Sequence, residues 1–220
     1  MKITVAQEIK EACPAFAGVA VYAEVRNSAF SEGLWAEINA FIGELIASTR
    51  MEDIKRQPVI AATREAYKRC GKDPGRYRPS AEALRRRLMR GIPLYQIDTL
   101  VDLINLVSLR TGYSIGGFDA DKIQGDALEL DIGRADEPFE AIGRGMLNIE
   151  GLPVYRDAVG GIGTPTSDHE RTKMGLETTR LLAVVNGYNG EAGLAEAARM
   201  IQTLLSNYAG SGEWQTYYFH

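Results

Sequence analysis

The chain has 220 residues, which is enough for one sizeable hydrophobic core. Hydrophobic residues make up 45% and charged residues 25% of the sequence, and these globular values exclude wholesale disorder. The formal net charge of -4 argues against a protein that coats nucleic acid through bulk charge, because that binding depends on neutralising many phosphates.

No stretch of the sequence is apolar enough for a membrane span, and the N-terminal segment MKITVAQEIKEACP contains acids and lacks the apolar centre of a secretion signal. We therefore expect a cytoplasmic protein with no membrane partner. Cys13 and Cys70 lie far apart and form no CxxC pair. We expect two reduced, buried thiols, with neither a disulfide framework nor a metal cage.

The first half of the sequence predicts one strand followed by four helices. The segment FAGVAVYAEVRN is rich in the β-branched and aromatic residues of a core strand. Apolar residues then recur at helical spacing in four segments, each followed by residues that stop a helix. We expect these helices over residues 32–49 with Ser31 as the N-cap, 58–70 before Gly71, 80–90 before Gly91, and 99–111 before Gly112.

The helix over residues 99–111 has a capping-box spacing at its start, because Thr99 and Asp102 form a T-x-x-D pattern. Leucine, isoleucine and valine follow at i, i+3, i+4 and i+7 and bury one face. This periodicity places Asp102 and Asn105 on a polar flank of the helix.

The second half of the sequence predicts short extended pieces separated by glycines, followed by a strand and a closing helix. Ser167 and Glu170 repeat the capping-box spacing, so a short helix or turn is expected there. We expect a single α+β domain with a central mixed β core flanked by helices. The expected extended pieces are residues 116–125, 127–133, 137–143 and 152–161, the strand is 179–188 and the helix is 192–208.

Two glycine-containing segments do not match nucleotide or calcium motifs. The segment DADKIQGD has its glycine one position late for an EF-hand, and position twelve is Leu130 in place of a bidentate Glu. The segment GGIGTPTSDHERT lacks the Lys-Ser/Thr of a P-loop and the GxGxxG of a dinucleotide fold. We therefore expect no nucleotide cofactor, and no cofactor of another kind is indicated.

The sequence SDH contains the residue types of a hydrolytic triad, but side chains adjacent in sequence project in different directions. His169 is the only internal histidine, so a metal site is not expected either. Both a structural role and a chemical role remain open for Ser167, Asp168 and His169. Gly116 and Gly117 also have two interpretations, since paired glycines either turn the chain or let backbone amides approach a ligand.

The segment from Arg64 to Arg90 is strongly basic, with ten Lys or Arg and only three acids. Exposed charge on a helix is usually a solvated face, but the same charges are able to contact RNA phosphates. The candidate RNA-binding residues are Arg78, Arg85, Arg86 and Arg90.

Several strings within residues 67–185 resemble the B3/B4 domain of the phenylalanyl-tRNA synthetase β subunit, especially its stand-alone relatives. They are RPSAEALRRR, LVDLINLVSL, GGFDADKIQGD, and SDHERTK followed by TTRLLAVV. The resemblance implies that residues 1–66 are an N-terminal part of the same domain and that residues 186–220 form a closing helix and tail. It implies an α+β fold with a cleft and affinity for the aminoacyl end of a tRNA, because in the synthetase this domain hydrolyses tyrosine wrongly attached to the phenylalanine tRNA.

The resemblance carries over Asn105, Phe118 and Asp119, which match the family's helix asparagine and its Phe-Asp segment. Gly116 stands where the synthetase domain has a histidine, and the string LLAVV stands where it has a glutamate that recognises the tyrosine hydroxyl. Without that carboxylate the site loses its means of selecting a phenol. Tyrosine specificity is therefore not expected.

Three hypotheses follow from these patterns. In the first, the chain hydrolyses a mischarged aminoacyl-tRNA, with the amides of Gly116 and Gly117 stabilising the oxyanion and Asp119, Asp168 or His169 positioning a water. In the second, it binds tRNA or its aminoacyl end without chemistry, and in the third it holds a free amino acid or related small molecule. No DNA partner is expected. The candidate substrate-binding residues are Asn105, Gly116, Gly117, Asp119, Ser167, Asp168 and His169.

Overall fold

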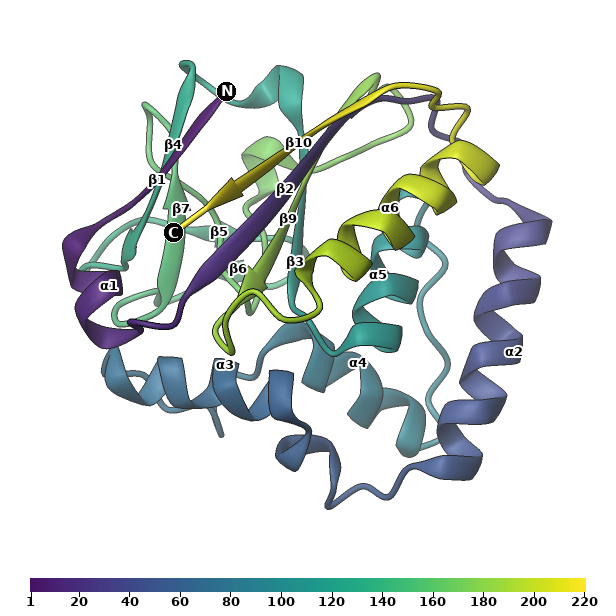
Figure 1. The fold of residues 1–220 in the computed structure, drawn as a ribbon, viewed down its shortest axis with the longest axis horizontal. Coiled ribbons are helices and arrows are strands. Elements are labelled where there is room, and N and C mark those ends of the chain that lie inside the picture. Colours follow the sequence, from purple (N-terminus) through teal and green to yellow (C-terminus); the bar gives the residue numbers. More distant parts are fainter.

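Two four-stranded sheets form the centre of the computed structural model, which describes all 220 residues (Figure 1). The first sheet is antiparallel and has the order β10-β2-β9-β3. The second has the order β1-β4-β7-β8 and is mixed, because β1 pairs parallel with β4 whereas the other pairs are antiparallel. The strands are β1 (Lys2–Val5), β2 (Ala17–Glu24), β3 (Ile115–Asp119), β4 (Ala127–Ile132), β7 (Pro153–Arg156), β8 (Gly161–Gly163), β9 (Arg180–Gly187) and β10 (Trp214–Phe219).

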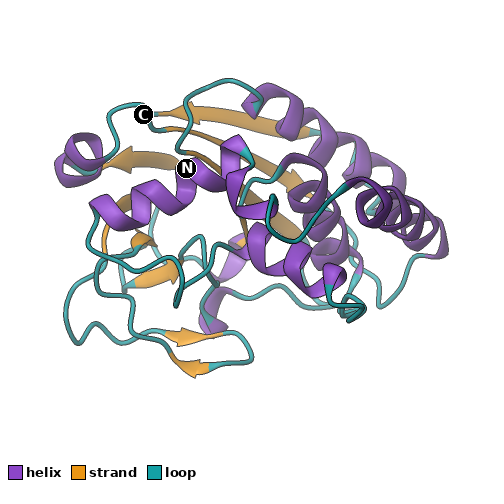
Figure 2. Cartoon of the chain, turned by 90° about the horizontal axis from the view of Figure 1, so that it is seen from below, coloured by secondary structure: helices purple, strands orange, loops and turns teal.

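Six α-helices surround the sheets, with α2, α5 and α6 grouped on the side away from the second sheet (Figure 1). Three 3-10 turns and a small β5–β6 hairpin complete the chain, and the hairpin lies at the margin of the molecule (Figure 2). The α+β fold class is thereby confirmed. The helices are α1 (Gln7–Ala12), α2 (Glu32–Ser48), α3 (Pro58–Arg69), α4 (Ser80–Met89), α5 (Thr99–Thr111) and α6 (Leu194–Tyr208), the hairpin strands are β5 (Glu140–Ala141) and β6 (Gly145–Met146), and the turns are η1 (Ile54–Arg56), η2 (Ala120–Lys122) and η3 (Glu170–Thr172).

The first sheet is covered on both faces, which explains the continuous apolar run of β9. Successive side chains of a strand point to opposite faces. Leu181, Ala183 and Val185 belong to the larger core with α2, α5 and α6, whereas Leu182 and Val184 belong to the core shared with the second sheet. A strand buried on both faces needs no polar alternation, so its sequence alone shows only that it is buried.

The predicted helices are confirmed, with a correction at the start of α5. Ser31 caps α2 by accepting a hydrogen bond from the amide of Leu34, and Gly112 ends α5 in the left-handed conformation with φ 83°. The cap of α5, however, is Asp98, which accepts a hydrogen bond from the amide of Val101. The predicted capping box does not form, because tertiary partners take both of its side chains.

The hydroxyl of Thr99 pairs with that of Ser28 at 2.7 Å, and the carboxylate of Asp102 accepts a hydrogen bond from Trp35 Nε1 at 2.7 Å. Asp102 is therefore buried, and the prediction that it lies on a polar flank is wrong. Burial raises its pKa, and the hydrogen bond from Trp35 opposes that rise. Asn105, the other predicted member of the flank, is half-buried.

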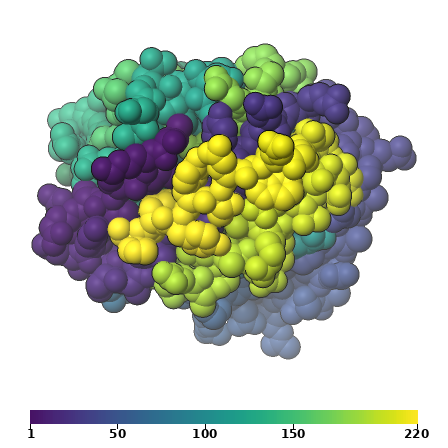
Figure 3. All heavy atoms as spheres, turned by 45° about the horizontal axis from the view of Figure 1, so that its top comes forward, coloured from purple at the N-terminus to yellow at the C-terminus, as the bar shows by residue number.

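Among the elements that were not predicted from the sequence are β1, α1 and β10. The C-terminal segment, predicted as a tail, forms the edge strand β10, whose aromatic residues include Trp214 and Phe219. This strand crosses the surface beside the N-terminal segment, so the first and last strands of the chain are neighbours (Figures 1 and 3). None of the helices combines the length and the apolar character that a bilayer span requires.

Candidate functional site

The glycine pair Gly116 and Gly117 lies within β3, the edge strand of the first sheet, and both residues are buried. The interpretation of the pair as a turn after α5 is therefore corrected. Their backbone is extended and pairs with Val184 and Ala183 of β9. The turn after α5 is made instead by Gly112, whose positive φ supplies the left-handed conformation.

The two glycines are required by close packing. A Cβ atom on Gly116 would lie 2.7 Å from the phenyl ring of Phe118 and 3.5 Å from Asp168 Oδ1. A Cβ on Gly117 would lie 2.6 Å from Ile104 Cδ1. A third glycine, Gly163 of β8, would place its Cβ 2.7 Å from Asp168 Oδ1. The missing side chain of Gly163 therefore makes room for the Asp168 carboxyl, whereas those of Gly116 and Gly117 make room for Phe118 and Ile104.

Asp168 joins the free edge of β3 through a hydrogen bond from the amide of Gly117 to Oδ2, with a length of 3.0 Å. Its backbone forms a bridge with Gly163, so the carboxyl is held between the edges of the two sheets. The residue is half-buried. Burial raises the pKa of Asp168 to about 7, although the bond from Gly117 favours the charged form. A carboxyl with such a pKa is able to accept and release a proton near neutral pH.

Asp168 belongs to a tight turn, residues 164–169, which we name the Asp168 turn. The hydroxyl of Thr164 donates to the carbonyl of Ser167 and accepts a hydrogen bond from its amide. His169 follows and caps η3, because its Nδ1 accepts a hydrogen bond from the amide of Arg171 at 2.9 Å. The predicted cap at Ser167 is therefore replaced by His169. Ser167, Asp168 and His169 are all half-buried, so this turn reaches the surface.

The His169 ring packs edge-on against Phe139, with ring centroids 5.0 Å apart. Burial and the neighbouring Arg171 guanidinium lower the pKa of His169. The imidazole is therefore neutral near pH 7. Because its Nδ1 accepts a hydrogen bond, the ring proton belongs on Nε2, and Nε2 is available as a donor.

The other two predicted site residues do not join this group through hydrogen bonds. Asp119 is buried at the end of β3, where it accepts hydrogen bonds from the Thr178 hydroxyl and the amide of Asp121, and it pairs with Lys122 at 3.2 Å. These contacts give it a structural role at the start of η2. Asn105 is half-buried on α5, one residue after the Ile104 side chain that approaches Gly117.

The four predicted RNA-binding arginines lie in different environments. Arg85 is buried, and its guanidinium donates to Gln57 Oε1 and to the carbonyl of Leu109 at 2.6 Å. It is therefore not available to a phosphate, and its assignment as an RNA contact is corrected. Arg86 pairs with the buried Glu82 at 2.7 Å, and Arg64 pairs with the same carboxylate. Arg78 and Arg90, in contrast, are exposed and form no ion pair.

The segment that carries the exposed Arg78 contacts the Asp168 turn two residues later, at Ser80. The amide of Ser80 donates to the carbonyl of Pro165 with a length of 2.8 Å. The hydroxyls of Tyr67 on α3 and Thr166 in the turn pair at 2.9 Å. The basic segment before α4 and the Asp168 turn therefore form one continuous region, which a linear reading of the sequence does not show.

A buried polar network behind this region was also missed. Asn186 of β9 accepts a hydrogen bond from the Tyr155 hydroxyl and donates to the carbonyl of Ser114. The Ser114 hydroxyl accepts in turn from the amide of Ala81 at the start of α4. Only Asn186, a polar residue at the end of an apolar strand, was a visible signal of this network.

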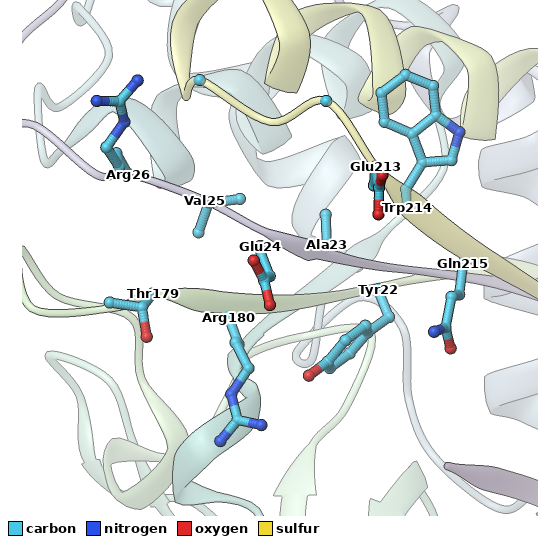
Figure 4. A pocket seen from close by; sticks show the side chains of 12 residues that line it. Tyr22, Ala23, Glu24, Val25, Arg26, Thr179, Arg180, Glu213, Trp214 and Gln215 are labelled. Atoms are coloured by element: carbon cyan, nitrogen blue, oxygen red, sulfur yellow. The ribbon is translucent and has the colours of Figure 1, made fainter.

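A surface depression elsewhere on the molecule contains none of the predicted site residues. It has a volume of about 830 Å³ and lies where β2, β9 and the segment before β10 meet. In Figure 4, Tyr22 and Arg180 project to one side of the strands while Trp214 projects to the other. Because these side chains diverge, they do not form a converging set of binding groups. No three His, Cys, Asp or Glu side chains are grouped as metal ligands.

Comparison with known proteins places this architecture in a family. The chain is similar in structure to an N-terminal fragment of the phenylalanyl-tRNA synthetase beta-subunit from Pyrococcus horikoshii, with a TM-score of 0.53 and 14% identity. The similarity covers 99% of this chain and 50% of that fragment, so the chain spans half the fragment's length, and at this identity it shows the fold alone. None of the curated proteins matches the sequence. The family model described as the B3/4 domain matches residues 62–208, and the chain therefore belongs to the B3/4 domain family.

Proposed function

We propose that the protein binds the aminoacyl end of a tRNA at the Asp168 turn, with exposed arginines contacting the RNA backbone. The observation that carries the proposal is the hydrogen bond between Ser80 and Pro165, which holds the segment of Arg78 against the turn. An aminoacyl-tRNA end presents phosphates next to an ammonium and an ester. A cation on the segment that contacts the turn, together with the carboxyl of Asp168 and the neutral imidazole of His169, complements those groups.

The family and the fold support this proposal, since the related fragment belongs to a tRNA synthetase subunit. Within the site, Asp168 is suited to accept from the substrate ammonium and His169 Nε2 to donate to the ester carbonyl or a ribose hydroxyl. Arg90 extends the cationic surface at the other end of α4. Asn105 and Ser167, which are half-buried, remain proposed neighbours of the bound end, whereas the buried Gly116 and Gly117 act only through Asp168, which the Gly117 amide holds in place.

Filter binding of tRNA to the full chain tests the proposal, with Arg78→Glu compared to Arg199→Glu. Both residues are exposed and free of ion pairs, and Arg199 lies on α6. We expect Arg78→Glu to weaken binding about tenfold at low salt and Arg199→Glu to change it less than about twofold. Both substitutions change the net charge by the same amount, so a difference between them reports where the charge lies. Equal losses for the two variants, or no retention of tRNA by the wild type at low salt, would contradict the proposal.

The aminoacyl end is tested separately by competition between aminoacylated tRNA and tRNA that lacks its terminal CCA. The aminoacylated form should bind more tightly, because only it carries groups for Asp168 and His169. If the two forms bind equally, the RNA contact is real but the Asp168 turn does not receive the end. Binding of free amino acids that is unaffected by Arg78→Glu would favour a small-molecule pocket instead.

Hydrolysis of a mischarged ester is the second candidate, and the pKa of Asp168 near 7 favours it. A carboxylate with this pKa is able to take a proton from an attacking water, whereas His169, with a protonated Nε2, is suited to donate. The amide of Gly117 already donates to Asp168, so it is not free to stabilise an oxyanion as predicted from the sequence. Asp168 therefore carries the catalytic hypothesis.

Deacylation of a panel of aminoacyl-tRNAs tests this second candidate. The rate should rise with pH through about 7 as Asp168 ionises, and Asp168→Asn should abolish it while tRNA binding remains. A panel in which no ester is released faster than in buffer would rule out the catalytic function but leave the binding proposal in place.

A further inference from the structure

Cys13 and Cys70, which are 57 positions apart in the sequence, are brought together by the fold. Cys13 is the residue that ends α1, and Cys70 is the residue that ends α3. The C-terminal ends of these two helices lie side by side (Figure 1). Cys13 belongs to the core between the two sheets, and Cys70 packs against that core. The two free thiols lie close enough for each to shift the pKa of the other.

Polar groups around the two thiols favour charge on one of them. The Arg69 guanidinium reaches across to α1 and donates to the carbonyl of Ala12 at 3.4 Å, which places a cation beside Cys13. The hydrogen bond from Cys70 and the charge of Arg69 lower the pKa of Cys13 despite its burial. The same pairing raises the pKa of Cys70. Cys13 is therefore the thiol of the pair that ionises more readily, and Cys70 is the one that keeps its proton.

The surroundings of the two thiols also include a surface depression at Cys70 and the unpaired hydroxyl of Tyr188. Cys70 is half-buried and lines a surface depression of about 490 Å³ together with Lys72 and Glu150. Tyr188 is buried in the same core, and its hydroxyl has no hydrogen-bond partner. Cys13 belongs to the same core, and Cys70 packs against it. A buried unpaired hydroxyl is uncommon in proteins and is available to a sulfur or oxygen anion formed beside it.

We propose that Cys13 and Cys70 form a redox pair in which a hydroperoxide such as hydrogen peroxide closes an internal disulfide between α1 and α3. The Cys13 thiolate attacks one peroxide oxygen, the O–O bond breaks, and the released hydroxide is protonated to water. The sulfur of Cys70, having lost its proton, then attacks the Cys13 sulfenic acid. The S–O bond breaks and a second water is released, so the thiol pair loses two electrons and the peroxide gains them.

Peroxide treatment of the reduced full chain, followed by peptide mapping without reductant, tests the proposal. The expected product is a monomer in which the peptides of Cys13 and Cys70 are linked, with a mass lower by two hydrogen atoms and full reversal by dithiothreitol. The oxidised protein should also melt at a higher temperature, because the bond closes a loop of about 57 residues in the unfolded chain. Oxidation to sulfonic acids, linkage between two molecules, or two unreacted thiols would overturn the proposal.

Single-cysteine variants test the assigned roles without requiring the disulfide. In Cys70→Ser, peroxide should leave a sulfenic acid on Cys13 that dimedone labels, whereas in Cys13→Ala the remaining Cys70 should stay unlabelled. Arg69→Met should slow oxidation of the wild-type pair about threefold, and Lys68→Met, which removes the neighbouring exposed cation, should not. Labelling of Cys70 in place of Cys13, or equal rates for the two charge variants, would overturn the assignment.

Discussion

The carboxyl of Asp168 makes the stability of the protein depend on pH in a direction that the structure determines. Burial raises its pKa from 3.8 to about 7. The folded chain therefore holds this proton more tightly than the unfolded chain does. The stability contributed by the proton is full below the unfolded value of 3.8 and is lost as pH rises through about 7. Asp168→Asn removes the titration, because the amide stays neutral throughout.

The size of the effect follows from the shift. Each pKa unit corresponds to about 1.4 kcal/mol, so the shift sets a ceiling of about 4 kcal/mol, of which about 3 kcal/mol is lost between about pH 5 and about pH 8. Asp168 is half-buried, and partial solvent screening reduces the amount to about 1–2 kcal/mol. The free energy of unfolding of Asp168→Asn, taken relative to that of the wild type, should therefore rise by about 1–2 kcal/mol from about pH 5 to about pH 8.

Urea denaturation of wild type and variant at the two pH values measures this change in the free energy of unfolding. Other titrating groups are common to both proteins and cancel in the difference. Asp126→Asn is the matched control, because Asp126 is exposed and forms no ion pair, and its stability difference should be the same at both pH values. If the stability difference between Asp168→Asn and the wild type is also the same at both pH values, burial does not raise the pKa of this carboxyl.

Three further predictions concern stability and are measured by the same urea unfolding. Gly43→Ala in α2 should stabilise the protein by about 0.5–1 kcal/mol, because the new Cβ meets nothing within 4 Å, and a loss would contradict this. Glu82→Gln should cost about 2–4 kcal/mol, because Arg64 and Arg86 both pair with this buried carboxylate, and a neutral effect would show that the pairs contribute no net stability. Asp98→Ala should cost about 1 kcal/mol through loss of the α5 cap, whereas an unchanged unfolding midpoint would argue against Asp98 as the cap.

The helices could be predicted because their signals are local. In α5 the apolar spacing and Gly112 define the helix and its end within one short window of sequence. The choice of cap was less certain, because Asp98 and Thr99 are both capping residue types. That choice depends on Ser28 and Trp35, which come from a distant part of the chain and bind Thr99 and Asp102. A capping motif therefore predicts the helix start more reliably than it predicts the residue that caps it.

The candidate site was only partly predictable. The sequence indicated Ser167, Asp168 and His169 as candidate site residues, and the structure places all three in one turn that reaches the surface. The glycine pair was harder, because glycine suits both a turn and a crowded strand, and only the pairing of β3 with β9 and the approach of Asp168 decide between them. Arg85 shows the same limit, since nothing in a run of arginines distinguishes the buried one.

By itself the sequence determined the helices, the apolar central strand and the family resemblance, because periodicity, caps and motifs are properties of neighbouring residues. Only the tertiary structure decided which charged groups are buried, which glycines make room for a carboxyl, and which distant side chains meet. Cys13 and Cys70, or Arg78 and the Asp168 turn, are joined by contacts between segments far apart in the chain. Burial and partner identity set the pKa and reactivity of these groups, and both are fixed only when the sheets and helices pack.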